Sequence, residues 1–466
     1  MTGPSAVTDP FEERYALGIR DEVAEAPPGL ESVPATSARP PAEPFALRGC
    51  VLTPEEKLDD GYVVVSGATV ASVTPTKPQG VKIFPTDGVI LPGLIDLHGH
   101  PEYNVFAAWE PPKLYVNRYA WRRSDEYKAI VREPWAKLTG QPNSLLTDLT
   151  RYAEARALVG GVTAIQGASG KYPSKEEALV RNVDLRIFGE HKARSIIDLG
   201  RTAPEDQRRY REQIDGGEVT ALYVHLAEGV DETSRKELGE LADASLLTHA
   251  TVIIHGTALT PAQLRDVKDA GAKLVWSPQS NLRLYAQTTA AAEALRLAIP
   301  MGLGADWMPS GSQSLLRELK VARRQLELQE VDLSRAELAR QLVLMATAVG
   351  AEIAGLGDKL GTLEEGRAAD ILVLERRFED PWENVVEAEP SWVQLVTIGG
   401  DLVYGAKAWI DELAAADEAE DVLAWGKPMV LDTSYAAAAT GSPPVRLREV
   451  RARLLSRYPQ TGPIFA

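Results

Sequence analysis

The sequence predicts an α/β protein: a (β/α)8 TIM barrel joined to a small composite β-sandwich domain that both ends of the chain build. Two observations support this prediction. Between residues 145 and 306, short apolar runs alternate with helix-like segments, and polar residues gather where the runs end. Short β-like runs separated by turn residues occur both before and after this region. Parallel strands that are each followed by a helix are typical of a barrel with its active site at the carboxyl ends of the strands.

Composition restricts the class of protein. The 466 residues, 44% of them hydrophobic, can bury a large core. The net charge of −16 argues against a nucleic-acid partner, because phosphate binding needs a basic surface. The single cysteine, Cys50, excludes an intrachain disulfide and a thiolate cluster, so any metal needs nitrogen and oxygen ligands. No run suits a membrane span or a signal peptide, so we expect a cytoplasmic protein without a membrane partner.

Changes in composition along the chain divide it into five segments. We assign them as a flexible N-terminal arm (1–44), the first part of the β-sandwich (45–88), the metal-dependent barrel (89–362), the second part of the β-sandwich (363–405) and a C-terminal helical extension (406–466). The arm is rich in Pro, Ala, Glu and Ser and cannot bury enough apolar surface to fold by itself. In the extension we expect an acidic helix around 413–425 and a basic helix around 445–457.

The stretch Gly88–His100 is an apolar run that ends at two histidines separated by one glycine. Because side chains alternate between the faces of a strand, His98 and His100 project to the same side, and Gly99 leaves room beside them. Asp96 shares that face one step deeper. This pattern predicts a buried strand that ends in a metal site. The alternative is a pair of satisfied core histidines, and the signals further along the chain favour the metal site.

The segment 101–138 follows this strand directly and is unusually aromatic, with three arginines among its rings. Most of the aromatic side chains are expected to pack in a subsidiary core under a long loop. A second interpretation is that part of the loop covers the pocket and brings Arg118, Tyr119 and Trp121 into contact with a substrate. Flat rings and arginines suit a planar heterocycle, including one that bears an acidic group.

Further polar residues stand at the ends of other apolar runs. Four of the six histidines, His98, His100, His225 and His255, lie at such ends, and Asp306 ends a further run. Strand ends converge at one mouth of a barrel, so this set predicts nitrogen and oxygen ligands for zinc or iron(II). Glu228 stands at the edge of the same mouth, unless it is a solvated loop carboxylate. Ser280 and Asn281 either bind substrate or cap the next turn, and Trp307 is a further substrate-binding candidate.

Six motifs together resemble the amidohydrolase superfamily, in particular its cytosine deaminase and triazine hydrolase-like branch, over roughly residues 45–405. They are Leu91–His100, His225–Glu228, His255–Gly256, Ser277–Asn281, Gly302–Asp306 and Gly361–Asp370. The resemblance implies one divalent metal ion, Zn2+ with Fe2+ as the alternative, and the ligands it implies are His98, His100, His225 and Asp306. It also implies that Glu228 is a proton shuttle and that His255 lies beside the activated water. Asp306 and His255 would accept or orient the proton of that water.

The predicted activity is metal-dependent hydrolysis of a C–N bond in a cyclic or aromatic small molecule, by deamination or by opening of a cyclic amide. Two alternatives are a non-catalytic barrel scaffold and metal-assisted chemistry other than hydrolysis. Lys192 is the one candidate for bridging a second metal, so a single ion is favoured. The sequence leaves open the substrate, the metal and the oligomeric state, with a homodimer among the alternatives.

Overall fold

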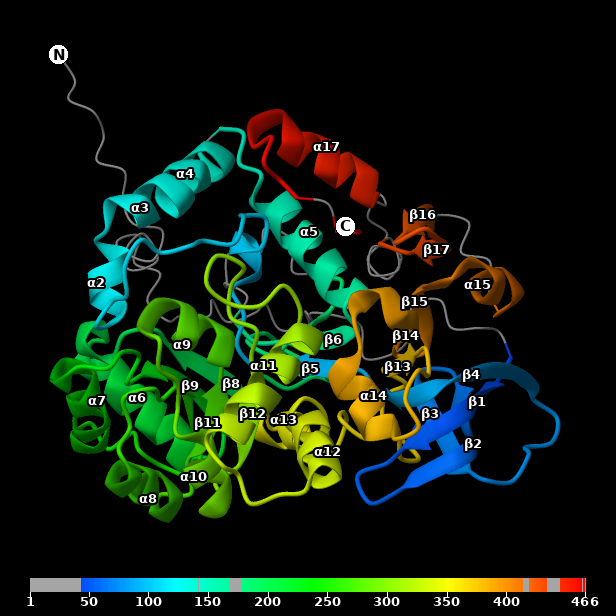
Figure 1. The fold of residues 1–466 in the computed structure, drawn as a ribbon, viewed down its shortest axis with the longest axis horizontal. Coiled ribbons are helices and arrows are strands. Elements are labelled where there is room, and N and C mark those ends of the chain that lie inside the picture. Colours follow the sequence, from blue (N-terminus) through cyan, green and yellow to red (C-terminus); the bar gives the residue numbers. More distant parts are fainter. Residues whose placement is uncertain are drawn as a thin grey trace.

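The structure is a computed structural model, and it describes residues 43–140, 142–167, 178–413, 419–433, 445–462 and 464–465. The predicted flexible arm, residues 1–44, lies outside the described residues except for Glu43 and Pro44. Figure 1 shows a barrel beside a large sheet to which both ends of the chain contribute. The predicted fold class is therefore confirmed.

Eight short parallel strands form the barrel. They are β5 (Leu94–Asp96), β6 (Val162–Ile165), β7 (Arg181–Asn182), β8 (Ala193–Ile196), β9 (Ala221–Leu226), β10 (Thr251–His255), β11 (Lys273–Trp276) and β12 (Met301–Leu303). The first three pair in the order β5-β6-β7 and the others in the order β12-β11-β10-β9-β8. The amide of Leu97 donates to the carbonyl of Leu303 at 3.0 Å, which joins the β5 end of one sheet to the β12 end of the other.

Helices follow most of these strands and cover the outside of the barrel. They are α5 (Leu146–Val159), α6 (Pro204–Asp215), α7 (Glu232–Asp243), α8 (Pro261–Asp269), α9 (Pro278–Tyr285), α10 (Ala291–Arg296), α11 (Leu315–Leu328), α12 (Arg335–Met345) and α13 (Ala348–Ile353), with the short η4 (Leu199–Arg201). Local sequence sets several of their starts. The side chain of Ser334 and that of Glu337 form a capping box that satisfies free backbone donors at the start of α12.

The large sheet combines nine strands from both chain ends. They are β1 (Phe45–Leu52), β2 (Lys57–Ser66), β3 (Thr69–Thr74), β4 (Lys82–Pro92), β13 (Ile371–Leu374), β14 (Val393–Ile398), β15 (Asp401–Ala406), β16 (Glu420–Ala424) and β17 (Lys427–Leu431), in the order β16-β17-β15-β14-β13-β4-β1-β2-β3. The seam is the antiparallel pair of β4 with β13, where Ile90 lies opposite Val373. Strand β4 runs on into β5, so the sheet anchors the strand that precedes the two histidines.

The C-terminal part differs from the prediction. The acidic helix expected around 413–425 is wrong, because residues 420–431 form the hairpin of β16 and β17 at the edge of the large sheet. Trp425 and Gly426 turn the hairpin with positive φ angles of 46° and 77°. Pairing with a neighbouring strand here outweighs the helix propensity of the acidic residues. Among the described residues, the short helix α15 (Lys407–Leu413) precedes the hairpin.

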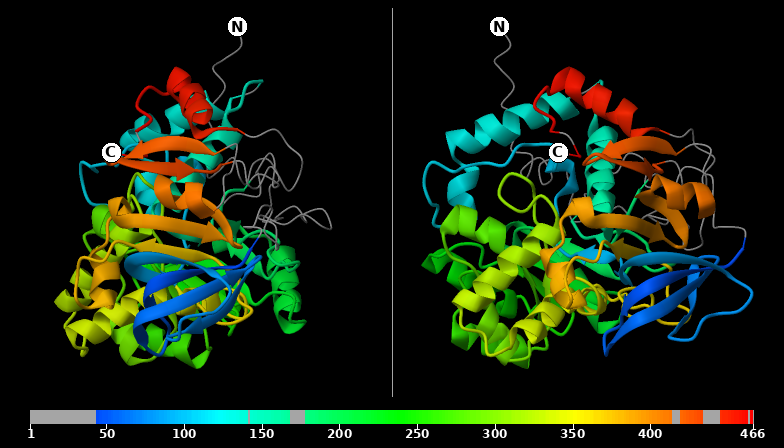
Figure 2. Two further views of the ribbon diagram at one scale, coloured as in Figure 1. Left: turned by 90° about the vertical axis from the view of Figure 1, so that its right-hand side faces the viewer. Right: turned by 45° about the vertical axis from the view of Figure 1, so that its right-hand side comes forward.

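The basic helix expected around 445–457 is confirmed as α17 (Leu447–Arg457), which packs against α5 (Figure 2). Arg453 on α17 pairs with Asp148 on α5 at 2.7 Å. Helix α14 (Pro381–Glu387) and the turn η5 (Pro390–Trp392) connect β13 with β14.

The aromatic segment after the metal strand folds into short helical pieces rather than an open loop. They are η1 (Pro101–Tyr103), α2 (Arg118–Arg122), α3 (Asp125–Tyr127), η2 (Lys128–Arg132) and α4 (Glu133–Thr139). Most of its aromatic rings are buried, as the prediction of a subsidiary core requires. No helix among the described residues is long and apolar enough to cross a membrane.

Candidate metal centre and active site

The four predicted metal ligands meet at the carboxyl ends of the barrel strands. The Nε2 atom of His98 lies 3.1 Å from Nε2 of His225 and 3.6 Å from Oδ1 of Asp306. His100 Nε2 lies 3.7 Å from the same Asp306 oxygen. Ligands about 2.0–2.1 Å from one tetrahedral ion are separated by roughly 3.3 Å. The donor set therefore fits one divalent ion in both chemistry and spacing.

Contacts behind the ligands fix their positions. His98 Nδ1 lies 2.8 Å from the hydroxyl of Ser277, so Nε2 is the ring nitrogen left to face the other ligands. Asp96 is not a ligand in this arrangement: its Oδ1 accepts from the amides of His98 at 3.2 Å and Ala305 at 3.1 Å. The amide of Asp306 donates to the carbonyl of His98 at 2.7 Å. These bonds tie the end of β5 to the segment after β12.

Two residues of the site have the left-handed backbone conformation that favours glycine. The φ angle is 69° at His255 and 59° at Asp306. Strained backbone of this kind persists only where surrounding structure enforces it, and it clusters at functional sites.

Burial decides the charges of the cluster. It lowers the pKa of His98 well below its usual range, and the three other histidines nearby act in the same direction. Burial also raises the pKa of Asp306 to about 7. Imidazole and carboxylate side chains together form a donor set that suits a divalent cation.

Glu228 is buried, with 5% of its surface exposed, so it is not a solvated loop carboxylate. Its Oε2 lies 3.7 Å from His255 Nε2, and its Oε1 accepts a hydrogen bond from the hydroxyl of Tyr285 at 2.7 Å. The indole N–H of Trp121 in turn donates to that hydroxyl at 2.9 Å. A chain of hydrogen bonds therefore links the aromatic segment to the carboxylate of Glu228.

A small cavity of about 30 Å3 opens among these residues. Those that line it are His100, Arg118, Trp121, Arg122, Ile197, His225, Glu228, His255, Asp306 and Trp307. Three predicted substrate-binding residues, Arg118, Trp121 and Trp307, thus lie at the cavity, whereas three others do not line it: Tyr119, Ser280 and Asn281.

The residues that do not line the cavity support those that do. Asn281 Oδ1 lies 2.9 Å from His255 Nδ1. The hydroxyl of Ser280 lies 2.8 Å from that of Ser310, which accepts a hydrogen bond from the indole N–H of Trp307 at 2.6 Å. The hydroxyl of Tyr119 accepts from Arg118 at 2.9 Å. Their contacts hold other site residues in place.

Arg118 uses its own donors inside the protein. Its NH1 donates to the carbonyl of His225 at 2.8 Å, and its NH2 donates to Glu237 Oε1 at 3.0 Å. Asp198 adds a second buried carboxylate 3.8 Å away. The guanidinium therefore holds the end of β9 in place through hydrogen bonds. Its predicted contact with a substrate stays a prediction.

Sequence reasoning missed Tyr285 as a partner of Glu228. Its position four residues after Asn281 on α9 was the available signal, because residues i and i+4 share a helix face. Lys192, the candidate for bridging a second metal, immediately precedes β8 and so stands at the amino end of that strand, away from the metal ligands. It pairs there with Glu190 at 3.6 Å.

Comparisons with known proteins agree with this geometry. The sequence model described as "Amidohydrolase family" matches residues 203–403. The 5-methylthioadenosine/S-adenosylhomocysteine deaminase of Teredinibacter turnerae is 25% identical over 361 residues, which cover 70% of this chain and 81% of that protein. The 8-oxoguanine deaminase of Pseudomonas aeruginosa is 24% identical over 412 residues, which cover 73% of this chain and 88% of that protein.

Solved structures share the fold of this chain. An adenosine deaminase from Xanthomonas campestris with bound zinc superposes with a TM-score of 0.65 at 18% identity, covering 88% of this chain and 98% of its own. The atrazine chlorohydrolase of Arthrobacter aurescens, complexed with zinc, gives a TM-score of 0.61 at 20% identity, covering 77% of this chain and 95% of its own. The match to the Amidohydrolase family model over residues 203–403 and the deaminase relatives make this chain similar to the amidohydrolase superfamily, and the solved structures share its fold.

Proposed function

We propose that the protein is a zinc-dependent hydrolase that removes an exocyclic amino group from a nitrogen heterocycle and releases ammonia. The observation that carries this proposal is the buried Glu228 carboxylate, which faces both the cavity and His255 beside the candidate metal ligands. The names of the sequence relatives, which are deaminases of purine-type compounds, support deamination rather than ring opening.

The metal would be held by His98, His100, His225 and Asp306. The ligand atoms of the three histidines lie within 4.8 Å of one another, and the Asp306 carboxylate lies 3.6 Å from His98 and 3.7 Å from His100. Zinc in the similar adenosine deaminase supports this choice of ion. A divalent ion in such a site supplies Lewis acidity, which brings the pKa of a water molecule from its bulk value towards about 7.

The surrounding side chains can move the protons that deamination requires. Glu228 has one oxygen toward His255 and the other held by Tyr285, so it can take up a proton and deliver it to the leaving nitrogen. Asn281 fixes the ring orientation of His255 from behind. Asp306 borders the same cavity and is a second carboxylate that can accept a proton there.

Two indole rings give the cavity a flat apolar wall. The ring centroids of Trp121 and Trp307 are 5.6 Å apart, and the planes are tilted by 35°. Aromatic surfaces of this kind favour a planar heterocycle. The cavity of about 30 Å3 is smaller than the roughly 300–1,000 Å3 of typical small-molecule sites.

The test is a screen of the zinc-loaded protein against aminopurines, their nucleosides, aminotriazines and cyclic amides, with ammonia and ring-opened acids measured separately. We expect ammonia from an aminoheterocycle and a loss of at least about 100-fold in turnover for Glu228→Gln at unchanged zinc content. Glu232→Gln, on the exposed start of α7, is the matched control. Ring-opened acid without ammonia, or full activity in Glu228→Gln, would contradict the proposal.

A further inference from the structure

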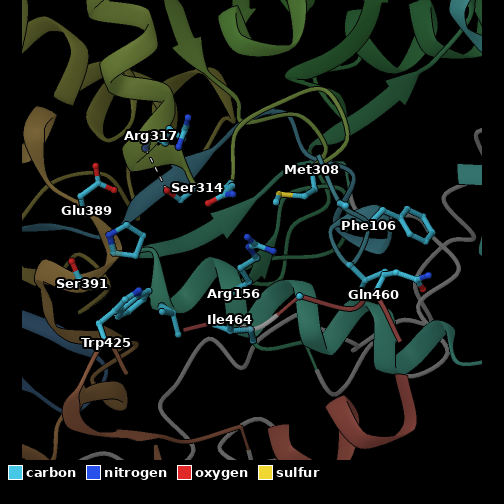
Figure 3. A pocket seen from close by; sticks show the side chains of 16 residues that line it. Phe106, Arg156, Met308, Ser314, Arg317, Glu389, Ser391, Trp425, Gln460 and Ile464 are labelled. Carbon is cyan, nitrogen blue, oxygen red and sulfur yellow. Dashed lines mark hydrogen bonds between the residues drawn. The ribbon is translucent and has the colours of Figure 1, made fainter. Parts of the chain in front are cut away.

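A second cavity, of about 460 Å3, lies away from the metal centre. Figure 3 shows it between helix α5, the start of α11, the loops that carry Phe106 and Met308, and the C-terminal residues Gln460 and Ile464. None of the residues that line the metal-centre cavity lines this one. Its volume falls within the range of small-molecule sites, about 300–1,000 Å3.

Arg156 is the central charged group of this cavity. Its side chain rises from α5 toward the middle of the space in Figure 3, and its NH1 donates to the carbonyl of Asn104 at 3.4 Å. Within the described part of the chain, no carboxylate pairs with it. Burial lowers the pKa of its guanidinium. A partly buried cation without a counter-charge costs stability, and an anionic ligand would remove that cost.

The remaining charges of the lining are also unbalanced toward positive. Arg317, on the first turn of α11, is a second arginine, and among the described lining residues Glu389 is the one carboxylate. Glu389 is already paired with Lys320 at 3.1 Å. Two arginines against one neutralised carboxylate form a positive pocket on a chain whose net charge is −16.

We propose that this cavity binds a small organic monoanion, a carboxylate carried on a planar apolar body. A planar carboxylate matches the fork of guanidinium donors on Arg156. The body would lie against the apolar walls that Phe106, Met308 and Trp425 provide.

Benzoate and its neutral isostere benzamide are the probes, titrated by calorimetry into the metal-loaded full chain. We expect saturable binding of benzoate, with benzamide at least about tenfold weaker. Arg156→Gln and Arg317→Gln should each weaken benzoate binding about tenfold or more, and Arg156→Lys less. Arg324→Gln is the matched control, because Arg324 lies on α11 with 67% of its side chain exposed and does not line the cavity.

Three results would overturn the proposal: no saturable binding of benzoate up to about 10 mM, equal affinity for benzamide, or undiminished affinity in both arginine variants. Arg317 is exposed, so Arg317→Gln keeps the test valid if Arg156→Gln fails to fold. Binding that is lost in Glu228→Gln but kept in the arginine variants would place benzoate at the metal centre and also overturn the proposal.

Discussion

The hydroxyl of Tyr285 donates a hydrogen bond of 2.7 Å to Oε1 of Glu228, although 57 positions separate the two residues in the chain. This bond fixes one oxygen of the proposed proton shuttle and leaves the other facing His255. The same hydroxyl accepts a hydrogen bond from Trp121, so Tyr285 connects the aromatic segment to Glu228.

Tyr285→Phe should therefore lower kcat about tenfold while zinc content and fold are retained, because Glu228 loses the donor that orients it. Steady-state kinetics with metal analysis would check this. Tyr62→Phe, on a buried strand of the large sheet, is the control for loss of a tyrosine hydroxyl. Unchanged kcat in Tyr285→Phe would show that Glu228 is positioned without this bond.

Ser277→Ala should weaken zinc binding about 10- to 100-fold, because the hydroxyl 2.8 Å from His98 Nδ1 sets the tautomer and orientation of that ligand. Competition with a chelator of known affinity measures the change. Ser66→Ala, on the exposed end of β2, should leave zinc affinity unaltered. Equal zinc affinity in Ser277→Ala and the wild-type protein would remove Ser277 from the metal-supporting shell.

Arg118→Met should destabilise the protein by about 3–5 kcal/mol, because it leaves the buried carboxylate of Glu237 without its cation and leaves Asp198 with Arg201 alone. Chemical denaturation of the zinc-loaded protein measures the free energy of unfolding. Arg123→Met, at the exposed end of the same helix, should change it by less than about 0.5 kcal/mol. A variant that is fully stable but has a raised KM would instead assign Arg118 mainly to substrate binding.

Glu318 should make stability depend on pH. Burial raises its pKa to about 8, so the folded protein keeps a proton there that the unfolded chain releases above about pH 4.3. The folded state thus binds more protons between these values, and the free energy of unfolding falls as pH rises toward 8. Its carboxyl bonds to Ser312 and to the amide of Gln279.

Glu318→Gln should flatten this fall by roughly 1 kcal/mol per pH unit between pH 5 and 8, because glutamine stays neutral throughout. Denaturation curves at several pH values measure the slope. Glu327→Gln, farther along the same helix and 42% exposed, should keep the wild-type slope. An unchanged slope in Glu318→Gln would mean that Glu318 is ionised in the folded protein.

Much of the site follows from local sequence. A run such as Leu91–His100 specifies a buried strand with two histidines on one face, and runs that end at His225, His255 and Asp306 specify further strands of the same kind. Because parallel strands of a barrel end at one mouth, the order of these runs is enough to bring the ligands together. The pairing of both chain ends in one sheet follows similarly, since short strands need partners to bury their apolar faces.

Contacts between distant segments were decided only by the tertiary structure. No local pattern encodes how α2, α7 and α9 pack against one another. That packing buries Glu228, brings it to Tyr285 and directs the Arg118 guanidinium to partners inside the protein. Residues 420–431 became strands because an open sheet edge supplied hydrogen-bond partners that outweigh helix propensity. Local sequence determines which residues can serve as ligands, whereas packing determines which neighbours each polar group meets and therefore its charge and its role.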